Sequence, residues 1–112
     1  MIVYHNSKCS KSRNAIDFLR EKGVDFSVVE YLKTPLKKDE LKNIVAKLGI
    51  VPLDLIRKGE PEFKENFKNK LLTNDEWLDA MVKFPKLIER PIVLTDVKAI
   101  VARPTERINE LF

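Results

Sequence analysis

The residue best suited to chemistry in this sequence is Cys9, its single cysteine. Cys9 lies in a polar stretch between an apolar run, 2–4, and a segment with helical spacing, so its sulfur is expected at a helix N-terminus. Free N–H groups and the helix dipole favour an anion there, and Lys8, Lys11 and Arg13 add positive charge. These effects can lower the pKa of a thiol, so the pattern predicts a nucleophilic thiolate. The alternative is an ordinary free cysteine, a residue type that is commonly buried.

The neighbours of Cys9 narrow its chemistry. Ser12 occupies the position of the second cysteine in a Cys-x-x-Cys pair, so no internal disulfide can form. The sixth residue after Cys9 is Ala15, where a Cys-x5-Arg phosphate loop would need arginine, which argues against a phosphatase-like mechanism. The site is therefore monothiol, and any second thiol must come from another molecule.

Two arginines flank a predicted β-hairpin, Arg90 before its first strand and Arg103 after its second. Antiparallel pairing would bring both to one end of the sheet, about 5 Å apart at the backbone. Such a pair of cations is favourable when an oxyanion lies between them, because each guanidinium can offer two donors. The alternative is that Glu89 and Glu106 pair with them at the surface.

Both arginines precede proline, which restricts each to extended backbone and so limits where its side chain begins. His5, four residues before Cys9, could influence the thiolate from the end of the first strand, although a hydrogen-bonded structural histidine fits equally well. We assign His5 a supporting role.

The elements that must position these residues begin with a strand–helix–strand pattern. The apolar run 2–4 is followed by a helix that buries Ala15, Phe18 and Leu19 and ends at Gly23. The segment 26–32 has the composition of a second strand. This βαβ unit implies two parallel strands joined by a right-handed crossover.

The middle of the chain is predicted to be helical and its end to be a hairpin. Leu41, Ile44, Val45 and Leu48 form one apolar stripe, and Thr73-x-x-Glu76 predicts a capping box before a helix that ends at 84–85. We expect a short helix or turn at 53–56 and an irregular connection over 61–72. Two strands around Asp96 and a terminal amphipathic helix starting at Pro104 complete the chain.

This order predicts an α/β fold: a mixed four-stranded sheet with helices packed against it, as in thioredoxin-like folds with an inserted helical region. We expect a single domain, 1–112, with core segments 1–32 and 90–112 and a helical insertion over about 33–89. The net charge of +4 suits an anionic ligand. Basic residues mostly adjoin acidic ones, no leader or membrane span is expected, and one cysteine fits a reducing compartment, so we predict a cytoplasmic protein that binds neither nucleic acid nor membrane.

The stretch Tyr4-His-Asn-Ser-Lys-Cys9-Ser-Lys-Ser-Arg-Asn14 resembles the active-site loop of the glutaredoxin-coupled ArsC arsenate reductases. Three further segments are similar to those that each supply an oxyanion-binding arginine in that family: Leu55-Ile-Arg57-Lys, Glu89-Arg90-Pro-Ile-Val-Leu-Thr95 and Ala102-Arg103-Pro-Thr-Glu106. The resemblance covers essentially the whole chain, and Arg57 acquires a role from it alone.

The resemblance implies a monomeric arsenate reductase with no metal or bound cofactor. Arsenate would bind among Arg57, Arg90 and Arg103, and Cys9 would attack arsenic to form a covalent adduct. Glutathione would be the co-substrate and glutaredoxin the partner that clears the resulting mixed disulfide. Pro91 would be the cis-proline beside the active site.

Two other functions are compatible with this pattern. A glutathione-dependent thiol-disulfide oxidoreductase of the same fold would also need Cys9, with the arginines binding glutathione carboxylates. A regulator resembling Spx would use the fold to bind RNA polymerase, but the missing Cys-x-x-Cys pair and the complete arginine set count against it.

Overall fold

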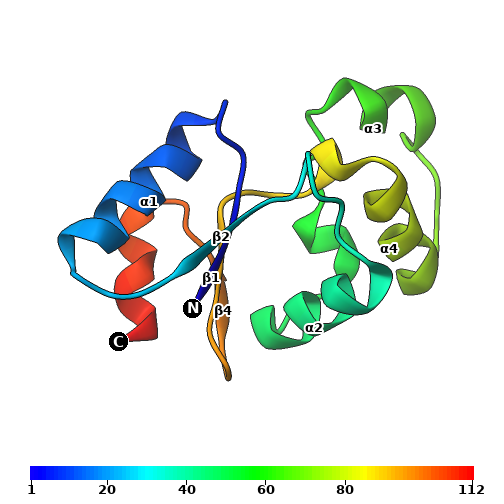
Figure 1. Cartoon of the computed structure of the whole chain (residues 1–112). Coiled ribbons are helices and arrows are strands. Elements are labelled where there is room, and N and C mark those ends of the chain that lie inside the picture. Colours follow the sequence, from blue (N-terminus) through cyan, green and yellow to red (C-terminus); the bar gives the residue numbers. More distant parts are fainter. The chain divides into compact units, whose positions relative to one another are not determined.

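The computed structural model describes residues 1–112, which fold into two compact units (Figure 1). The first contains Met1–Thr34 and Arg90–Phe112 and is called the sheet unit below; the second, Pro35–Glu89, is called the helical unit. None of the helices combines the length and apolar composition that a membrane-spanning helix needs. This division into two compact units does not test whether the chain is a single domain, so that expectation stays a prediction.

The sheet unit contains all the strands and confirms the predicted β-α-β and β-β-helix order. Its elements are β1 (Ile2–His5), α1 (Ser10–Glu21), β2 (Ser27–Glu30), β3 (Ile92–Leu94), β4 (Ala99–Val101) and the 3-10 helix η3 (Thr105–Leu111). Gly23, which follows the C-cap residue Lys22 of α1, has a φ of 69°, a left-handed conformation that glycine adopts without steric cost. The expected end of the first helix is therefore correct.

The sheet is mixed and four-stranded, in the order β2-β1-β3-β4. Strand β1 is parallel to β2, with Val3 opposite Val28, and antiparallel to β3, with Tyr4 opposite Ile92. The end of β1 therefore lies at the same edge of the sheet as the start of β3. Because β3 and β4 are also antiparallel, the end of β4 lies at that edge too. The topology brings the loop after β1 close to both ends of the hairpin.

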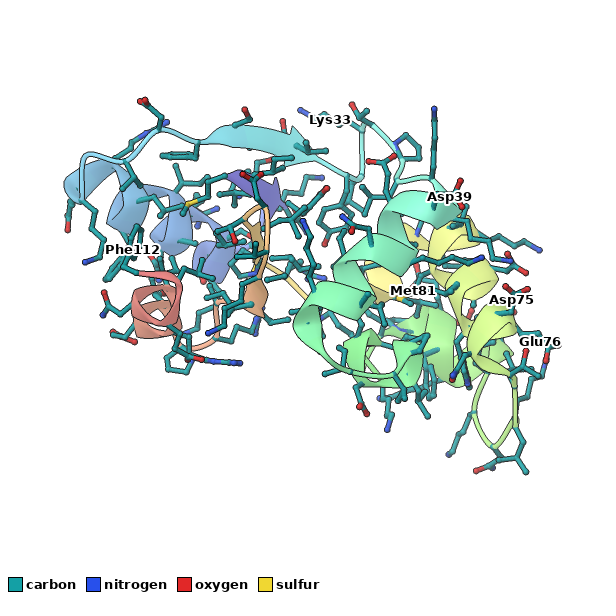
Figure 2. The ribbon with its side chains drawn as sticks, turned by 90° about the horizontal axis from the view of Figure 1, so that it is seen from below. Lys33, Asp39, Asp75, Glu76, Met81 and Phe112 are labelled. Atoms are coloured by element: carbon teal, nitrogen blue, oxygen red, sulfur yellow. The ribbon has the colours of Figure 1, made fainter.

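The core of the sheet unit lies between the sheet and two helical segments. Figures 1 and 2 both show η3, in red, beside α1, and these two segments contact each other. The buried cluster draws on strands, α1 and η3: Val3, Ala15, Ile16, Leu19, Val93, Ile100, Ala102 and Ile108. This packing fixes the position of α1 on the sheet, and with it the helix N-terminus that follows Cys9.

The helical unit contains α2 (Lys38–Leu48), η1 (Pro52–Leu55), α3 (Pro61–Asn66), α4 (Asn74–Lys83) and η2 (Pro85–Leu87). The predicted capping box is present, since Thr73 Oγ1 accepts from the Glu76 N–H and Glu76 accepts from the Thr73 N–H. Helices α2 and α4 contact each other, and Lys38 pairs with Asp75 and Asp79 at 2.8 and 2.9 Å.

Two expectations about local structure were wrong. The segment 61–72 is not wholly irregular, because Pro61 begins α3 and Phe63 and Phe67 pack on Trp77. Proline at the first helical position and aromatics spaced by four were the signals for this helix. At the C-terminus, Pro104 precedes the helix instead of starting it, because its ψ of 165° is extended, and the helix is 3-10 throughout.

We predict that Leu19→Ala destabilises the protein by about 2–5 kcal/mol, because Leu19 is fully buried in the core of the sheet unit. Urea denaturation followed by circular dichroism measures the change. Leu71→Ala makes the same chemical change at a fully exposed position and is expected to alter stability by less than about 0.5 kcal/mol. Equal effects of the two substitutions would contradict the packing described here.

Candidate active site

The loop that carries Cys9 is held by a set of short-range hydrogen bonds. The Cys9 N–H donates to the Asn6 carbonyl at 2.9 Å, and the Asn6 N–H donates to Ser12 Oγ at 3.3 Å. Arg13 Nη1 donates to the Ser7 carbonyl at 2.8 Å. Helix α1 then begins at Ser10, with Cys9 in extended conformation as its N-cap. The sulfur is therefore fixed at the helix N-terminus, as the sequence predicts.

The hairpin brings its two flanking arginines to this loop. Arg103 Nη2 lies 3.4 Å from Cys9 Sγ, and Arg103 Nε donates to the Arg90 carbonyl at 2.6 Å. The Ala102 N–H donates to the Pro91 carbonyl at 2.9 Å and closes the hairpin beside the pair. Arg103 thus donates hydrogen bonds to the sulfur and to a backbone carbonyl, and it does not pair with the carboxylate of Glu106. The sequence left that surface ion pair open as an alternative.

The pKa of the Cys9 thiol lies below its ordinary value, at about 7. Partial burial of the sulfur is the largest single effect and raises the pKa, but the stabilising groups together outweigh it. These are the backbone N–H of Ser12, a hydrogen bond and the positive charge of Arg90, and the backbone N–H of Lys11. The sulfur forms no regular capping hydrogen bond, although the Ser12 N–H is the largest of the effects that lower its pKa. The thiol therefore ionises more readily near neutral pH than an ordinary cysteine does.

The source of this stabilisation differs in part from the prediction. The side chains of Lys8 and Arg13 are not among the groups that lower the pKa of Cys9. Arg13 donates to the Ser7 carbonyl instead. The backbone of Lys11 contributes where its charge was expected to. Two residues that the sequence analysis missed, Asn6 and Ser7, hold the loop; the only signal for them was the turn-forming composition of 6–7.

His5 lies at the end of β1 and is 9% exposed. Burial lowers the pKa of its imidazole, and Arg13 lowers it further, against the opposing effect of Glu30. The ring is therefore neutral at neutral pH and adds no positive charge to the thiolate. Its Nδ1 has no hydrogen-bond partner, whereas a hydrogen bond with the Ser12 backbone acts on the ring, so the alternative of a hydrogen-bonded structural histidine stays open.

The other supporting residues have structural positions in the sheet unit. Ser12 is fully buried, and its Oγ holds the Asn6 N–H. The Arg90–Pro91 peptide bond is cis, as the resemblance implies, and the Arg103–Pro104 bond is cis as well, which was not foreseen.

Arg57 belongs to the helical unit, where its backbone is fixed by a short antiparallel bridge. The Arg57 N–H donates to the Leu87 carbonyl at 2.7 Å, and the Glu89 N–H donates to the Leu55 carbonyl at 2.8 Å. The Arg57 guanidinium forms an ion pair with Glu60, a partner that the sequence analysis did not identify. The role of Arg57 toward an oxyanion stays a prediction.

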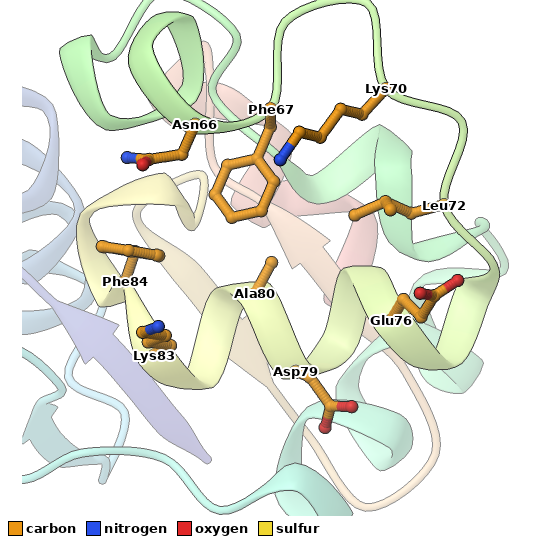
Figure 3. Close-up of a pocket in the computed structure, with 9 residues that line it drawn as sticks. All are labelled: Asn66, Phe67, Lys70, Leu72, Glu76, Asp79, Ala80, Lys83 and Phe84. Atoms are coloured by element: carbon orange, nitrogen blue, oxygen red, sulfur yellow. The ribbon is translucent and has the colours of Figure 1, made fainter.

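The helical unit also contains a cavity of about 410 Å³. Figure 3 shows Phe67 and Ala80 on its apolar side, with Lys70 reaching over the Phe67 ring. Glu76 and Asp79, which also line it, are engaged in the Thr73 capping box and the Lys38 ion pair. This cavity includes no cysteine, histidine or arginine, so it is separate in chemistry from the thiol site.

The geometry defines a class of protein. A single activated thiol at a helix N-terminus, beside an arginine pair at one edge of a mixed four-stranded sheet, is the arrangement of a monothiol protein with a thioredoxin-like fold. The family follows from comparison with known proteins. The ArsC family model matches residues 4–111, and the chain belongs to this family.

Known relatives agree over nearly the full length of the chain. An arsenate reductase of Neisseria meningitidis is 44% identical over 109 residues, which cover 96% of this chain and 93% of the relative. An arsenate reductase of Escherichia coli is 36% identical and is covered over 78% of its length, against 97% of this chain. The solved structure of an arsenate reductase from Vibrio cholerae superposes with a TM-score of 0.93 at 38% identity, covering 99% of this chain and 96% of that one.

We predict that alkylation of Cys9 by iodoacetamide rises with pH around a midpoint of about 7, because the thiolate is the reactive form. Arg90→Gln should move this midpoint upward, since it removes a charge that stabilises the thiolate. Arg107→Gln, at an exposed position on η3, should leave it unchanged. Mass spectrometry measures the rates. A midpoint near about 8.5 in the native protein would show that the sulfur is not activated.

We predict that Ser12→Ala destabilises the protein by about 1–3 kcal/mol, because the Asn6 N–H loses its acceptor in a partly buried loop. Urea denaturation measures the change. Ser27→Ala, an exposed serine in β2, is the matched control and should change stability by less than about 0.5 kcal/mol. No difference between the two variants would mean that the Ser12 hydroxyl does not hold the loop.

Proposed function

We propose that this protein is a monothiol arsenate reductase that uses glutathione as co-substrate and glutaredoxin as partner. The observation that carries the proposal is the contact of 3.4 Å between Arg103 Nη2 and Cys9 Sγ, with Arg90 also stabilising the thiolate. Two cations beside one nucleophilic sulfur favour an anionic substrate at that sulfur. Membership of a family whose relatives carry the name arsenate reductase supports arsenate as that anion.

In the first step, the Cys9 thiolate attacks the arsenic of dihydrogen arsenate and displaces one hydroxide, which takes a proton from solvent and leaves as water, and a sulfur–arsenic(V) adduct forms. Arg90 and Arg103 offset the negative charge on the remaining oxygens. Their side chains need no rearrangement for this, since the hairpin already holds them in place. Arg57 is the proposed third oxyanion ligand on the basis of the family resemblance. Its ion pair with Glu60 would have to open for that role.

In the second step, a glutathione thiolate attacks the Cys9 sulfur. The electron pair of the sulfur–arsenic bond moves to arsenic, which leaves as arsenic(III), and a disulfide forms between Cys9 and glutathione. Because Cys9 is the single cysteine of the chain, it cannot resolve this disulfide internally. Thiol-disulfide exchange with glutaredoxin restores the free thiol and transfers the glutathione.

Purified protein is expected to reduce arsenate in the presence of glutathione and glutaredoxin, with arsenite as the measured product. Cys9→Ser should abolish turnover, and Arg103→Lys should raise the KM for arsenate by roughly 10–100-fold, because the fork of donors is lost. Arg107→Lys should be without effect.

The opposite results are equally specific. Full activity of Cys9→Ser would refute the proposal. If arsenate is not reduced and does not protect Cys9 from iodoacetamide, while Cys9 still reduces glutathione mixed disulfides, the thiol-disulfide oxidoreductase is the better description.

A further inference from the structure

A second cavity, of about 340 Å³, lies in the sheet unit along α1. His5 lines it, and so does Ser10, the residue next to Cys9. The charged side chains that face it come from successive turns of α1: Arg13, Asp17 and Arg20. The cavity therefore reaches Ser10, the first residue of α1 and the chain neighbour of Cys9, and continues along the helix.

The charges in this cavity are available to a ligand. Asp17 and Arg20 are spaced three apart on α1, yet no ion pair joins them, and neither side chain has another hydrogen-bond partner. Comparable charges elsewhere do pair, as Arg107 does with Glu110 at 3.0 Å. Arg13 gives one N–H to the Ser7 carbonyl and retains the rest of its five donors. The cavity thus offers two guanidinium groups and one carboxylate.

This set matches the charges of a peptide thiol with a free α-amino acid end. Arg20 can bind an α-carboxylate through two donors, and Asp17 can accept from the adjacent ammonium group. Arg13 can bind a second carboxylate nearer to Cys9. The thiol of such a peptide lies on its middle residue, so each charged end is only about 7 Å from the sulfur. Arg20 lies about 15 Å along the helix from Ser10, and its long side chain, which leans toward the helix N-terminus, has to bridge the difference. An uncharged small thiol would use none of these groups.

Resting on the proposed function, we propose that the α1 cavity binds the thiol reductant and selects a tripeptide thiol with a free α-amino and α-carboxylate end. Arsenate and reductant then use different residues, since the arginines that bind the oxyanion, Arg90 and Arg103, are not part of this lining. Nothing in the catalysis of the first step requires Asp17 or Arg20.

The test uses the full-length protein with Cys9 converted to its mixed disulfide with thionitrobenzoate, and it needs no arsenate. A thiolate that attacks the Cys9 sulfur forms a new disulfide and releases the coloured thionitrobenzoate anion, whose absorbance gives the rate. Glutathione is compared with mercaptoethanol. We expect the glutathione rate to saturate, and Arg20→Gln and Asp17→Asn each to raise the half-saturating concentration about 10-fold.

The same variants should leave the mercaptoethanol rates unchanged to within about 2-fold, because that thiol makes no charged contacts. Lys22→Gln removes a positive charge at the C-terminal end of α1, close to Arg20, at a residue that does not line the cavity. It should change the rate with neither thiol. Equal losses with both thiols would show an effect on Cys9 itself and overturn the assignment, as would no change with either.

A second measurement does not depend on thiol reactivity. S-methylglutathione, titrated into the Cys9→Ser protein, should shift the backbone amide signals around Asp17 and Arg20, more weakly in Asp17→Asn. Shifts confined to other parts of the chain would overturn the assignment. If arsenate reduction fails while both measurements give the expected results, the cavity still binds the reductant and only the oxyanion substrate is wrong.

Discussion

The structure depends on one electrostatic arrangement, two guanidinium groups beside a sulfur that can carry a negative charge. Two neighbouring arginines repel each other, and the contact of 3.4 Å from Arg103 Nη2 to Cys9 Sγ shows what compensates them. The hydrogen bond of Arg103 Nε to the Arg90 carbonyl fixes the spacing of the pair. The thiolate and the arginines therefore stabilise each other, and an oxyanion that enters beside them meets donors already in position.

Sheet topology produces this arrangement from segments far apart in the sequence. Because β1 runs antiparallel to β3, the loop that follows His5 meets the start of the hairpin at one edge of the sheet. The register that sets Ile92 opposite Val101 then places Arg90 and Arg103 side by side, although 12 residues lie between them in the chain. Packing of α1 on the same sheet fixes the third component, the helix N-terminus.

The sequence was sufficient where local chemistry and strand pairing decide the outcome. The polar loop predicted the place of Cys9, and the hairpin pattern predicted the arginine pair. The sequence was insufficient where a side chain has several possible partners. Arg13 donates to a backbone carbonyl instead of adding positive charge beside Cys9, and Arg57 pairs with Glu60. Such choices depend on distances of a few ångströms that spacing alone does not define. The short helix α3 was missed because Phe63 is its one large apolar residue, which is too few to define a helical pattern.

Ser12, three residues after Cys9, has a structural role that a second cysteine could not take over. A dithiol enzyme would have its second sulfur at Ser12, close enough to attack the first. Here Ser12 is fully buried, its hydroxyl accepts from the Asn6 N–H, and its own N–H stabilises the thiolate. The residue that could resolve a disulfide instead holds the loop in place. Since Cys9 is only partly buried, its sulfur can be reached from outside, and no second cysteine of the chain can resolve a disulfide that forms on it.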